Sequence, residues 1–203
     1  MRLSQLAMTS LEIPFRQAFT HASATRTMTE TVLVRAESAG GLIGMGEGCP
    51  RRYVTGETVA GAREFFSNHQ ADWLRFTTVE ELRAWGQANA ALIDRNPAAW
   101  CAVETACLDL LGKETDRPIE AVLGGNRLSA PFRYSTVLGA EKLSTFQKQL
   151  HQYLTGGFTD FKVKVTGDLR TDRERVAAFM TVGPRPSGCV WMPTIAGSVE
   201  TRP

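Results

Sequence analysis

The alternation of extended and helical segments after Arg127 is the feature that most constrains the fold of this chain. Residues 130–139 and 160–165 are short, largely apolar runs of the kind that form strands, whereas residues 141–157 and 170–180 repeat apolar side chains at helical spacing. A strand, a helix, a strand and a helix in this order predict a βαβα unit with parallel strands. We therefore expect an α/β domain to begin in this part of the chain.

The first part of the chain has a different pattern and predicts an α+β domain. Residues 1–48 suggest antiparallel strands, because residues 30–38 alternate apolar and polar side chains and the pair Gly40-Gly41 signals a turn directly after them. Residues 58–125 predict helices instead. We find no internal repeat and no low-complexity segment.

Capping signals predict where three of the helices begin. Thr78 and Glu81 have the spacing of a capping box, and the helix that they open is expected to run to about residue 94. Asn96 is the expected N-cap of the next long helix. Thr171 and Glu174 have capping-box spacing again and predict the start of the last helix.

The composition argues against several classes of protein. The chain has 203 residues, a formal net charge of +2, 43% apolar and 22% charged residues, which is ordinary for a globular protein without bulk attraction to nucleic acid or membrane. The sequence contains no run of about 18 apolar residues, so we expect no transmembrane helix. We also see no signal peptide, and we therefore expect a cytoplasmic protein. The cysteines lack CxxC spacing and are interpreted as reduced thiols: Cys49, Cys101, Cys107 and Cys189.

The strand at 160–165 places two lysines on one face. Lys162 and Lys164 are two residues apart, so they point to the same side, while Phe161 and Val163 point to the other. The simplest interpretation is an exposed face or an edge strand blunted by lysine. In a (β/α)8 barrel, however, the face away from the helices is the interior, and its C-terminal end is the active-site mouth. There, two crowded ammonium groups would favour the neutral, basic form of one of them.

Five stretches in order resemble the enolase superfamily, specifically its muconate-lactonizing-enzyme subgroup: residues 13–34, 44–58, 98–125, 134–139 and 156–165. The resemblance extends from residue 11 to about residue 184. It implies an α+β N-terminal capping domain over residues 1–127, followed by the start of an α/β barrel of the TIM type, (β/α)7β. Residues 128–184 would form the first two β/α units of that barrel, which is incomplete in this chain.

The resemblance also implies a chemistry. Members of the family abstract the proton α to a carboxylate and give an enediolate that is held by Mg²⁺. By resemblance, Lys164 is the general acid/base, and Lys162 assists it or stabilises the enolate. The capping domain would supply specificity loops near residues 19–26 and 49–55. Four residues there are candidates for substrate contact, with ordinary surface-loop positions as the alternative: Thr20, His21, Arg51 and Tyr53.

Other polar residues suggest structural roles. Glu47 and Glu104 are isolated carboxylates, and Asp109 matches an aspartate of the family that lies on a helix. The glycine-rich stretch at 44–48 has neither the spacing nor the Lys-Ser/Thr pair of a phosphate-binding loop.

The resemblance stops at residue 184. The family carries three carboxylate metal ligands on the third, fourth and fifth barrel strands, and the third strand should follow Pro184 with a pattern like V-R-L-D-A-N-N. Residues 185–203 instead mix Pro, Gly and Ser with apolar residues at neither period, and we expect no strand there. From this part of the sequence no residue is predicted to bind metal, and the strand with the two lysines should be an open edge.

The genetic code offers an explanation for this tail. Reading "VWMPTIAG" at residues 190–197 from the third base of each codon gives NTG, GAT, GCC, NAC, NAT, HGC and NGG. Because Trp and Met have single codons, Asp-Ala is forced, and the seven codons permit L-D-A-N-N-R-W. The codon before them, YGT from Cys189, permits Arg, so the shifted frame permits R-L-D-A-N-N-R-W. We therefore interpret residues 185–203 as an out-of-frame tail that follows a one-base deletion between about residues 184 and 189, in the gene or in its sequencing.

The sequence leaves the function open between several candidates. We favour a racemase or epimerase that acts on a small carboxylate such as an N-acyl amino acid or a dipeptide. A muconate-type cycloisomerase and an o-succinylbenzoate synthase-like lyase use much the same residues. A candidate of another class is a non-catalytic capping-domain fragment that acts in binding or self-association, and a homo-oligomer is one option. The chain as written is expected to bind no catalytic Mg²⁺ and to turn over nothing.

Overall fold

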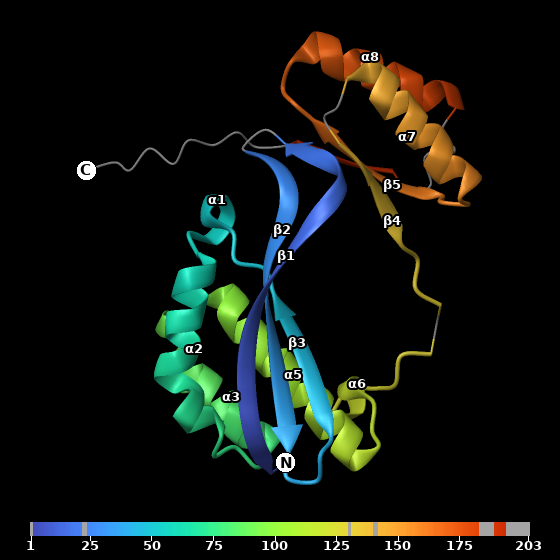
Figure 1. Ribbon diagram of the computed structural model, residues 1–203. Helices are drawn as coiled ribbons and strands as arrows, with labels where there is room; N and C mark the ends of the chain where they lie inside the picture. The colour runs from blue at the N-terminus through green and yellow to red at the C-terminus, as the bar shows by residue number, and fades with distance from the viewer. Residues whose placement is uncertain (1, 22–23, 130, 140–141, 183–188, 194–203) are drawn as a thin grey trace. The chain divides into compact units, whose positions relative to one another are not determined.

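The computed structural model describes two compact units of the chain (Figure 1). The first comprises Met1–Pro14 and Met28–Ser129, and the second comprises Phe15–Thr27 and Ala130–Pro203. The residues that the structure describes are 2–21, 24–129, 131–139, 142–182 and 189–193.

An antiparallel sheet runs through the N-terminal part of the chain. Its strands are β1 (Leu3–His21), β2 (Ala24–Ser38) and β3 (Ile43–Gly48), in the order β1-β2-β3. The predicted hairpin is confirmed, since β2 and β3 pair antiparallel around a turn in which Gly41 has a φ of 82°. Its alternation is confirmed as well, because Val32, Val34 and Ala36 are completely buried.

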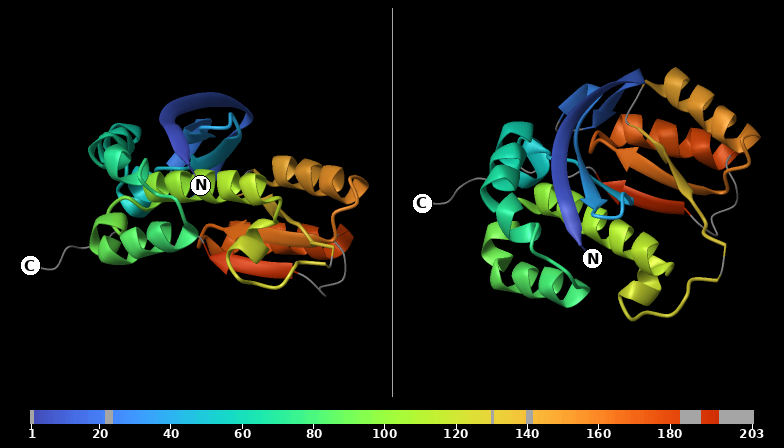
Figure 2. Two further views of the ribbon diagram at one scale, coloured as in Figure 1. Left: turned by 90° about the horizontal axis from the view of Figure 1, so that it is seen from below. Right: turned by 60° about the horizontal axis from the view of Figure 1, so that its bottom comes forward.

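The described residues of the first unit also contain six helices: α1 (Arg52–Thr55), α2 (Val59–Trp73), α3 (Val79–Ala88), α4 (Ala90–Ile93), α5 (Pro97–Thr115) and α6 (Ile119–Val122). The long helix α5 runs along the sheet (Figure 2). Trp73, Trp100 and Leu110 are buried in the core that the sheet and helices share. The capping box of Thr78 and Glu81 is confirmed.

Three glycines bring β3 into backbone contact with α5. Gly44, Gly46 and Gly48 alternate along the buried face of β3. A Cβ atom on them would lie 2.2, 2.1 and 1.9 Å from main-chain oxygens of α5, closer than any real Cβ contact. Those oxygens belong to three alanines at four-residue spacing: Ala106, Ala102 and Ala98 respectively. The glycines are therefore required by close packing of strand on helix.

The start of α5 is capped by a residue that the sequence did not predict. Asn96 occupies the N-cap position, but its side chain makes no capping hydrogen bond. Instead the buried carboxylate of Glu57 accepts hydrogen bonds from the main-chain N–H groups of Ala98, at 2.9 and 3.1 Å, and Ala99, at 3.3 Å. Glu57 thus ties the segment before α2 to the first turn of α5 and places a negative charge at its N-terminus.

We expect Glu57→Gln to lower the free energy of unfolding by about 1–3 kcal/mol, because it removes a buried, charge-assisted cap. Urea denaturation followed by circular dichroism measures the change. Glu64→Gln, at an exposed position on α2, is the matched control and should change stability by less than about 0.5 kcal/mol. Equal losses in the two variants would contradict the capping role.

The second unit contains a parallel sheet with two helices. Its elements are β4 (Ser135–Leu138), α7 (Leu143–Thr155), β5 (Asp160–Val165), α8 (Leu169–Val182) and β6 (Cys189–Pro193). The strands pair parallel in the order β4-β5-β6, which confirms the predicted βαβα unit. Its core joins residues of both helices to β4 and β5: Leu138, Phe146, Leu150, Phe161, Val163 and Phe179.

The expectation that no strand follows the last helix was wrong. Cys189–Pro193 forms β6 and pairs with β5, so β5 is the central strand of the sheet and not an open edge. The five residues are too few to show a period, and the scattered Pro, Gly and Ser around them masked the signal. A strand this short is stabilised by pairing with its neighbour more than by its own pattern.

Two predicted helix limits were also wrong. The helix that Thr78 opens ends at Ala88, and a separate short helix follows, instead of one helix to residue 94. The helix α8 begins at Leu169, so Thr171 lies inside its first turn and does not cap it. Its hydroxyl donates to Asp168, whose carboxylate also accepts from the N–H of Arg170 at 3.2 Å. Asp168 precedes the helix, where a capping residue belongs.

Candidate active site

The two lysines lie together on one face of β5. Lys162 and Lys164 are half-buried, while Phe161 and Val163 are buried on the opposite face in the core with α7 and α8. The predicted division of the strand into a lysine face and a helix face is confirmed. The catalytic roles of the lysines stay a prediction.

The neighbours of the lysines are given by the register of the sheet. Val137 of β4 lies opposite Lys162, and position 190 of β6 lies on its other side. Lys164 is paired with position 192 and is followed by Val165, the last residue of β5. Active sites of parallel β/α sheets form at the carboxyl ends of the strands. An amine at this place can take up or release a proton of a bound substrate.

A buried aspartate that the sequence analysis missed fixes the turn directly after Lys164's strand. Asp172, in the first turn of α8, is only 8% exposed. Its carboxylate accepts hydrogen bonds from the N–H of Thr166, at 2.9 and 3.0 Å, from the N–H of Gly167 at 2.8 Å and from the Thr166 hydroxyl at 3.0 Å. Arg175 donates to it at 3.2 Å. The sequence signal that could have indicated this contact is the pair Thr166-Gly167 after the strand, with an aspartate five residues after the glycine.

The electrostatics of Asp172 favour its charged form. Burial on its own raises the pKa of this carboxyl, but the hydrogen bonds from Thr166 and Gly167 and the charge of Arg175 outweigh burial, so the pKa is lowered from its ordinary value. The carboxylate is therefore a fixed negative charge at neutral pH.

The four substrate-contact candidates are divided between the two units, and Thr20 and His21 belong to the same unit as the lysines. Arg51 and Tyr53 belong to the first unit, and the lysines belong to the second. The Arg51 guanidinium donates to the main-chain oxygens of Glu30, at 2.7 Å, and Pro50, at 3.0 Å, and the Tyr53 side chain is 43% exposed. The backbone of Thr20 and His21 lies in β1, but their side chains lie outside the described part of the structure. A role in substrate binding stays a prediction for all four.

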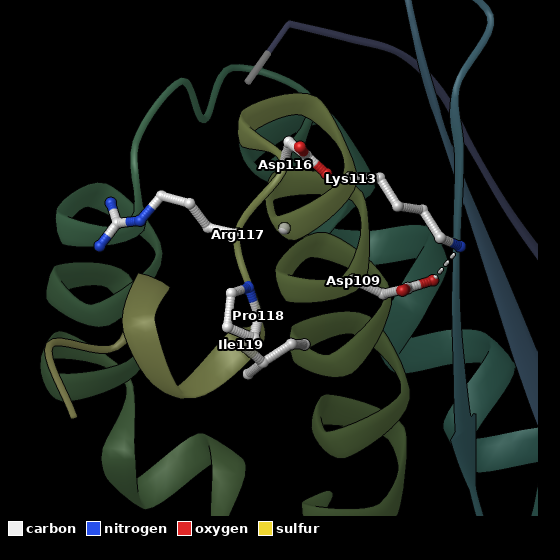
Figure 3. A pocket seen from close by; sticks show the side chains of 7 residues that line it. Asp109, Lys113, Asp116, Arg117, Pro118 and Ile119 are labelled. Carbon is white, nitrogen blue, oxygen red and sulfur yellow. Dashed lines mark hydrogen bonds and ion pairs between the residues drawn. The ribbon is translucent and has the colours of Figure 1, made fainter. Parts of the chain in front are cut away.

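Asp109 covers the edge of β3, which is consistent with the structural role that the sequence suggested for it. Its carboxylate accepts from the N–H of Met45 at 2.8 Å and from the ammonium group of Lys113 at 2.7 Å, and Lys113 also donates to the main-chain oxygen of Ile43 at 2.8 Å. Figure 3 shows the pair from α5 reaching β3. Two edge groups of the strand are thus already paired, and this protects it from pairing with another chain.

The same pair lines a depression of about 410 Å³ at the end of α5, together with Gly112, Asp116, Arg117, Pro118 and Ile119 (Figure 3). Asp109 and Lys113 point toward each other, and Arg117 points away from them. The opposite charges of Asp109 and Lys113 neutralise each other, and both side chains already bond to main-chain groups of β3. We therefore do not take this depression as the candidate site.

The other isolated carboxylates also have local surroundings. Glu47 accepts a hydrogen bond from the Thr31 hydroxyl at 2.7 Å. Glu104 is half-buried on α5; burial raises its pKa, and the charge of Arg83 opposes this. Burial, with the nearby charge of Glu104, raises the pKa of the Cys107 thiol to about 12, so this thiol is inert at neutral pH.

We expect acid to destabilise the fold through Asp109 and Asp172. Their folded-state pKa values lie below the ordinary value of 3.8, so their contribution to stability is present above that value and is lost as the pH falls through the folded pKa values. Urea denaturation at pH 6 and pH 3 measures the loss. The double variant Asp109→Asn, Asp172→Asn should lose less stability between these pH values than the unsubstituted chain does. An equal loss in both would contradict the assignment.

The described residues do not provide a metal site. Among them, no three His, Cys, Asp or Glu side chains are grouped so that they could hold a metal ion. No helix in the described part of the chain is long and apolar enough to cross a membrane.

Comparison with known proteins relates most of this chain to one family. Residues 5–124 match the model of the mandelate racemase / muconate lactonizing enzyme, N-terminal domain. A hydrophobic dipeptide epimerase of Enterococcus faecalis is 28% identical over 195 residues, which cover 88% of this chain and 49% of the relative. An L-Lys-D/L-Arg epimerase of Methylococcus capsulatus is 26% identical over 87% of this chain and 49% of the relative.

Solved structures show the same likeness. The dipeptide epimerase of Enterococcus faecalis V583, complexed with Mg and the dipeptide L-Leu-L-Tyr, is 28% identical and covers 90% of this chain and 51% of its own, with a TM-score of 0.78. The muconate lactonizing enzyme of Mucobacterium smegmatis, complexed with muconolactone, is 26% identical and covers 95% of this chain and 52% of its own, with a TM-score of 0.81. The chain spans about half the length of the curated relatives it matches.

Proposed function

Because the chain belongs to the mandelate racemase / muconate lactonizing enzyme family, we propose that the protein it represents is a racemase or epimerase that acts at the carbon α to a carboxylate. Membership confirms the expected α+β capping domain, followed by the first strands of a barrel that is incomplete in this chain. The observation that carries the proposal is the pair Lys162 and Lys164, half-buried on one face near the carboxyl end of the central parallel strand.

The relatives support a dipeptide or an N-acyl amino acid as the substrate. The Enterococcus protein is named for hydrophobic dipeptides, and its solved complex contains Mg and a dipeptide. We propose the same substrate class and the same metal for this protein. The metal would stabilise negative charge on the substrate carboxylate, but the residues that the structure describes do not supply its ligands.

In the proposed reaction Lys164 removes the proton from the α-carbon. Its amine lies one residue before the strand ends, and so next to the place where substrates bind in parallel sheets. Lys162, two residues earlier on the same face, adds a positive charge that stabilises the anion formed. Returning the proton to the other side of the carbon requires a second acid, which the two lysines on one strand do not provide.

A second candidate is cycloisomerisation of the muconate type. The muconate lactonizing enzyme of Mucobacterium smegmatis matches 95% of this chain. By the family resemblance, this chemistry would use the same two lysines. An o-succinylbenzoate synthase-like lyase remains in the same group. A non-catalytic role of the capping domain in binding or self-association is the alternative of another class.

We further propose that residues 185–203 are read in a shifted frame. If one base is added before codon 189, the codon at position 192 becomes GAT, which encodes aspartate. In the register of β5 with β6, that position lies opposite Lys164. The shifted frame would thus place a carboxylate next to the proposed base, on a strand that the structure already pairs there.

Exchange of the substrate α-proton tests the proposed function. Dipeptides and N-acyl amino acids are incubated in D2O with Mg²⁺ and the frame-restored protein, and deuterium at the α-carbon is followed by NMR. Exchange with change of configuration supports a racemase or epimerase, while conversion of a muconate without such exchange supports the second candidate. A discrete, stable oligomer in size-exclusion chromatography, without any turnover, would support the non-catalytic alternative.

A further inference from the structure

The turn between β5 and α8 is held by one carboxylate. Four donor groups converge on Asp172: the N–H and hydroxyl of Thr166, the N–H of Gly167 and the guanidinium of Arg175. Asp172 and Arg175 are both buried, 8% and 4% exposed. A carboxylate that accepts this many hydrogen bonds away from water has one arrangement available to it.

The hydrogen bonds to Asp172 hold the residues that directly follow the lysine strand. Thr166 directly follows the last residue of β5, and Lys164 lies two residues before Thr166. Gly167, with a φ of 91°, turns the chain toward α8. By fixing the main chain of Thr166 and Gly167, Asp172 also fixes the end of the strand from which Lys164 projects.

We infer that Asp172 is a positioning residue for Lys164, an assignment that rests on the proposed role of this lysine as the base. Asp172 acts on the lysine through the turn and does not touch the substrate. A base is effective only when its amine is held in one geometry relative to the proton it removes. The buried Arg175 holds the carboxylate from the side of α8.

Capping of α8 alone does not explain Asp172. That task falls to Asp168, which precedes the helix and bonds to Arg170 and Thr171. Asp172 lies within the first turn of the helix and reaches back to the residues after the strand. Asp168 therefore supports the start of α8, whereas Asp172 supports the end of the strand that carries the lysines. The two aspartates form a matched pair for an experiment.

Trace acetylation of the 203-residue chain tests the inference. The chain has five lysines, so mass spectrometry can follow the acetylation rate of each one: Lys113, Lys142, Lys148, Lys162 and Lys164. In Asp172→Asn we expect the acetylation rate of Lys164 relative to Lys113 to change by about threefold or more, because the half-buried amine of Lys164 is held less firmly and its exposure to the reagent changes. Asp168→Asn, which weakens only the helix start, should leave this ratio unchanged.

Thr166→Val keeps the test informative where Asp172→Asn fails to fold. It removes the hydroxyl that donates to Asp172 and accepts from the N–H of Asp168 at 3.3 Å, and it keeps the N–H of Thr166, so a smaller change of the same ratio is expected. An unchanged ratio in every folded variant, with stability lowered as much as in Asp168→Asn, would overturn the inference. A changed ratio together with no α-proton exchange by the frame-restored protein would instead contradict the proposed function and leave the positioning of Lys164 standing.

Discussion

Gly46→Ala is expected to lower the free energy of unfolding by at least about 3 kcal/mol, or to prevent folding altogether. The added Cβ would lie 2.1 Å from the main-chain oxygen of Ala102 and 2.5 Å from the main-chain nitrogen of Ala106. Both atoms belong to the backbone of α5, which cannot rotate out of the way as a side chain can. The strand and the helix would have to separate, and the core between them would open.

Urea denaturation, or the yield of folded protein where the variant does not refold, measures this effect. Gly40→Ala is the control, because a Cβ at that turn position meets only the Ser38 hydroxyl oxygen at 3.7 Å, an ordinary contact. It should change stability by less than about 0.5 kcal/mol. If Gly46→Ala were as well tolerated as Gly40→Ala, the backbone contact between β3 and α5 could not be as close as described.

The reason for these glycines was not predicted from the sequence, although its parts were visible. The hairpin followed from the alternation in residues 30–38 and from Gly40-Gly41, which are local signals. Gly44, Gly46 and Gly48 also alternate, but their meaning depends on a helix some 50 residues later in the chain, where alanines recur every four residues. Glycines at every second position of β3 and alanines at every fourth position of α5 can be recognised as one interface only when the strand and the helix are known to be in contact.

The same distinction between local and distant contacts separates what was predicted of the candidate site from what was missed. The shared face of Lys162 and Lys164 follows from the period of a strand, so the sequence was sufficient for it. Glu57 caps a helix that begins 40 residues later, and this contact depends on tertiary packing. Asp172 is near in sequence, but its role depends on how α8 folds back onto the end of β5. The strand β6 was missed because its partner, and not its composition, stabilises it.

A single added base between codons 184 and 189 is expected to convert a chain for which we predict no turnover into one that catalyses α-proton exchange. Sequencing of the gene from codon 180 to well beyond codon 203 should show that base, followed by codons for R-L-D-A-N-N and an open frame. Alternatively, the base can be introduced into the gene and the product purified. The expectation rests on two independent features: the forced Asp-Ala codons at "VWMP" and the pairing of position 192 with Lys164.

Lysine variants of the frame-restored protein connect this result to the site. Lys164→Met should lower the rate of α-proton exchange by about 100-fold or more, the usual contribution of a general base. Lys148→Met, at an exposed position on α7, is the control and should leave the rate unchanged. Exchange that survives in Lys164→Met would show that the proton is removed by another group, even if the frame itself were restored as expected.

The chain as written supplies the opposite arm of the experiment. Its β5 carries both lysines, but the metal ligands that the family resemblance implies belong to later barrel strands, so proton removal in this chain is expected to leave the substrate anion without a metal to balance it. We therefore expect no exchange above the rate of buffer at any Mg²⁺ concentration. Saturable exchange that requires Mg²⁺ and disappears in Lys164→Met of this same chain would refute both the frame proposal and the need for further carboxylates, and would place the metal ligands within the 203 residues.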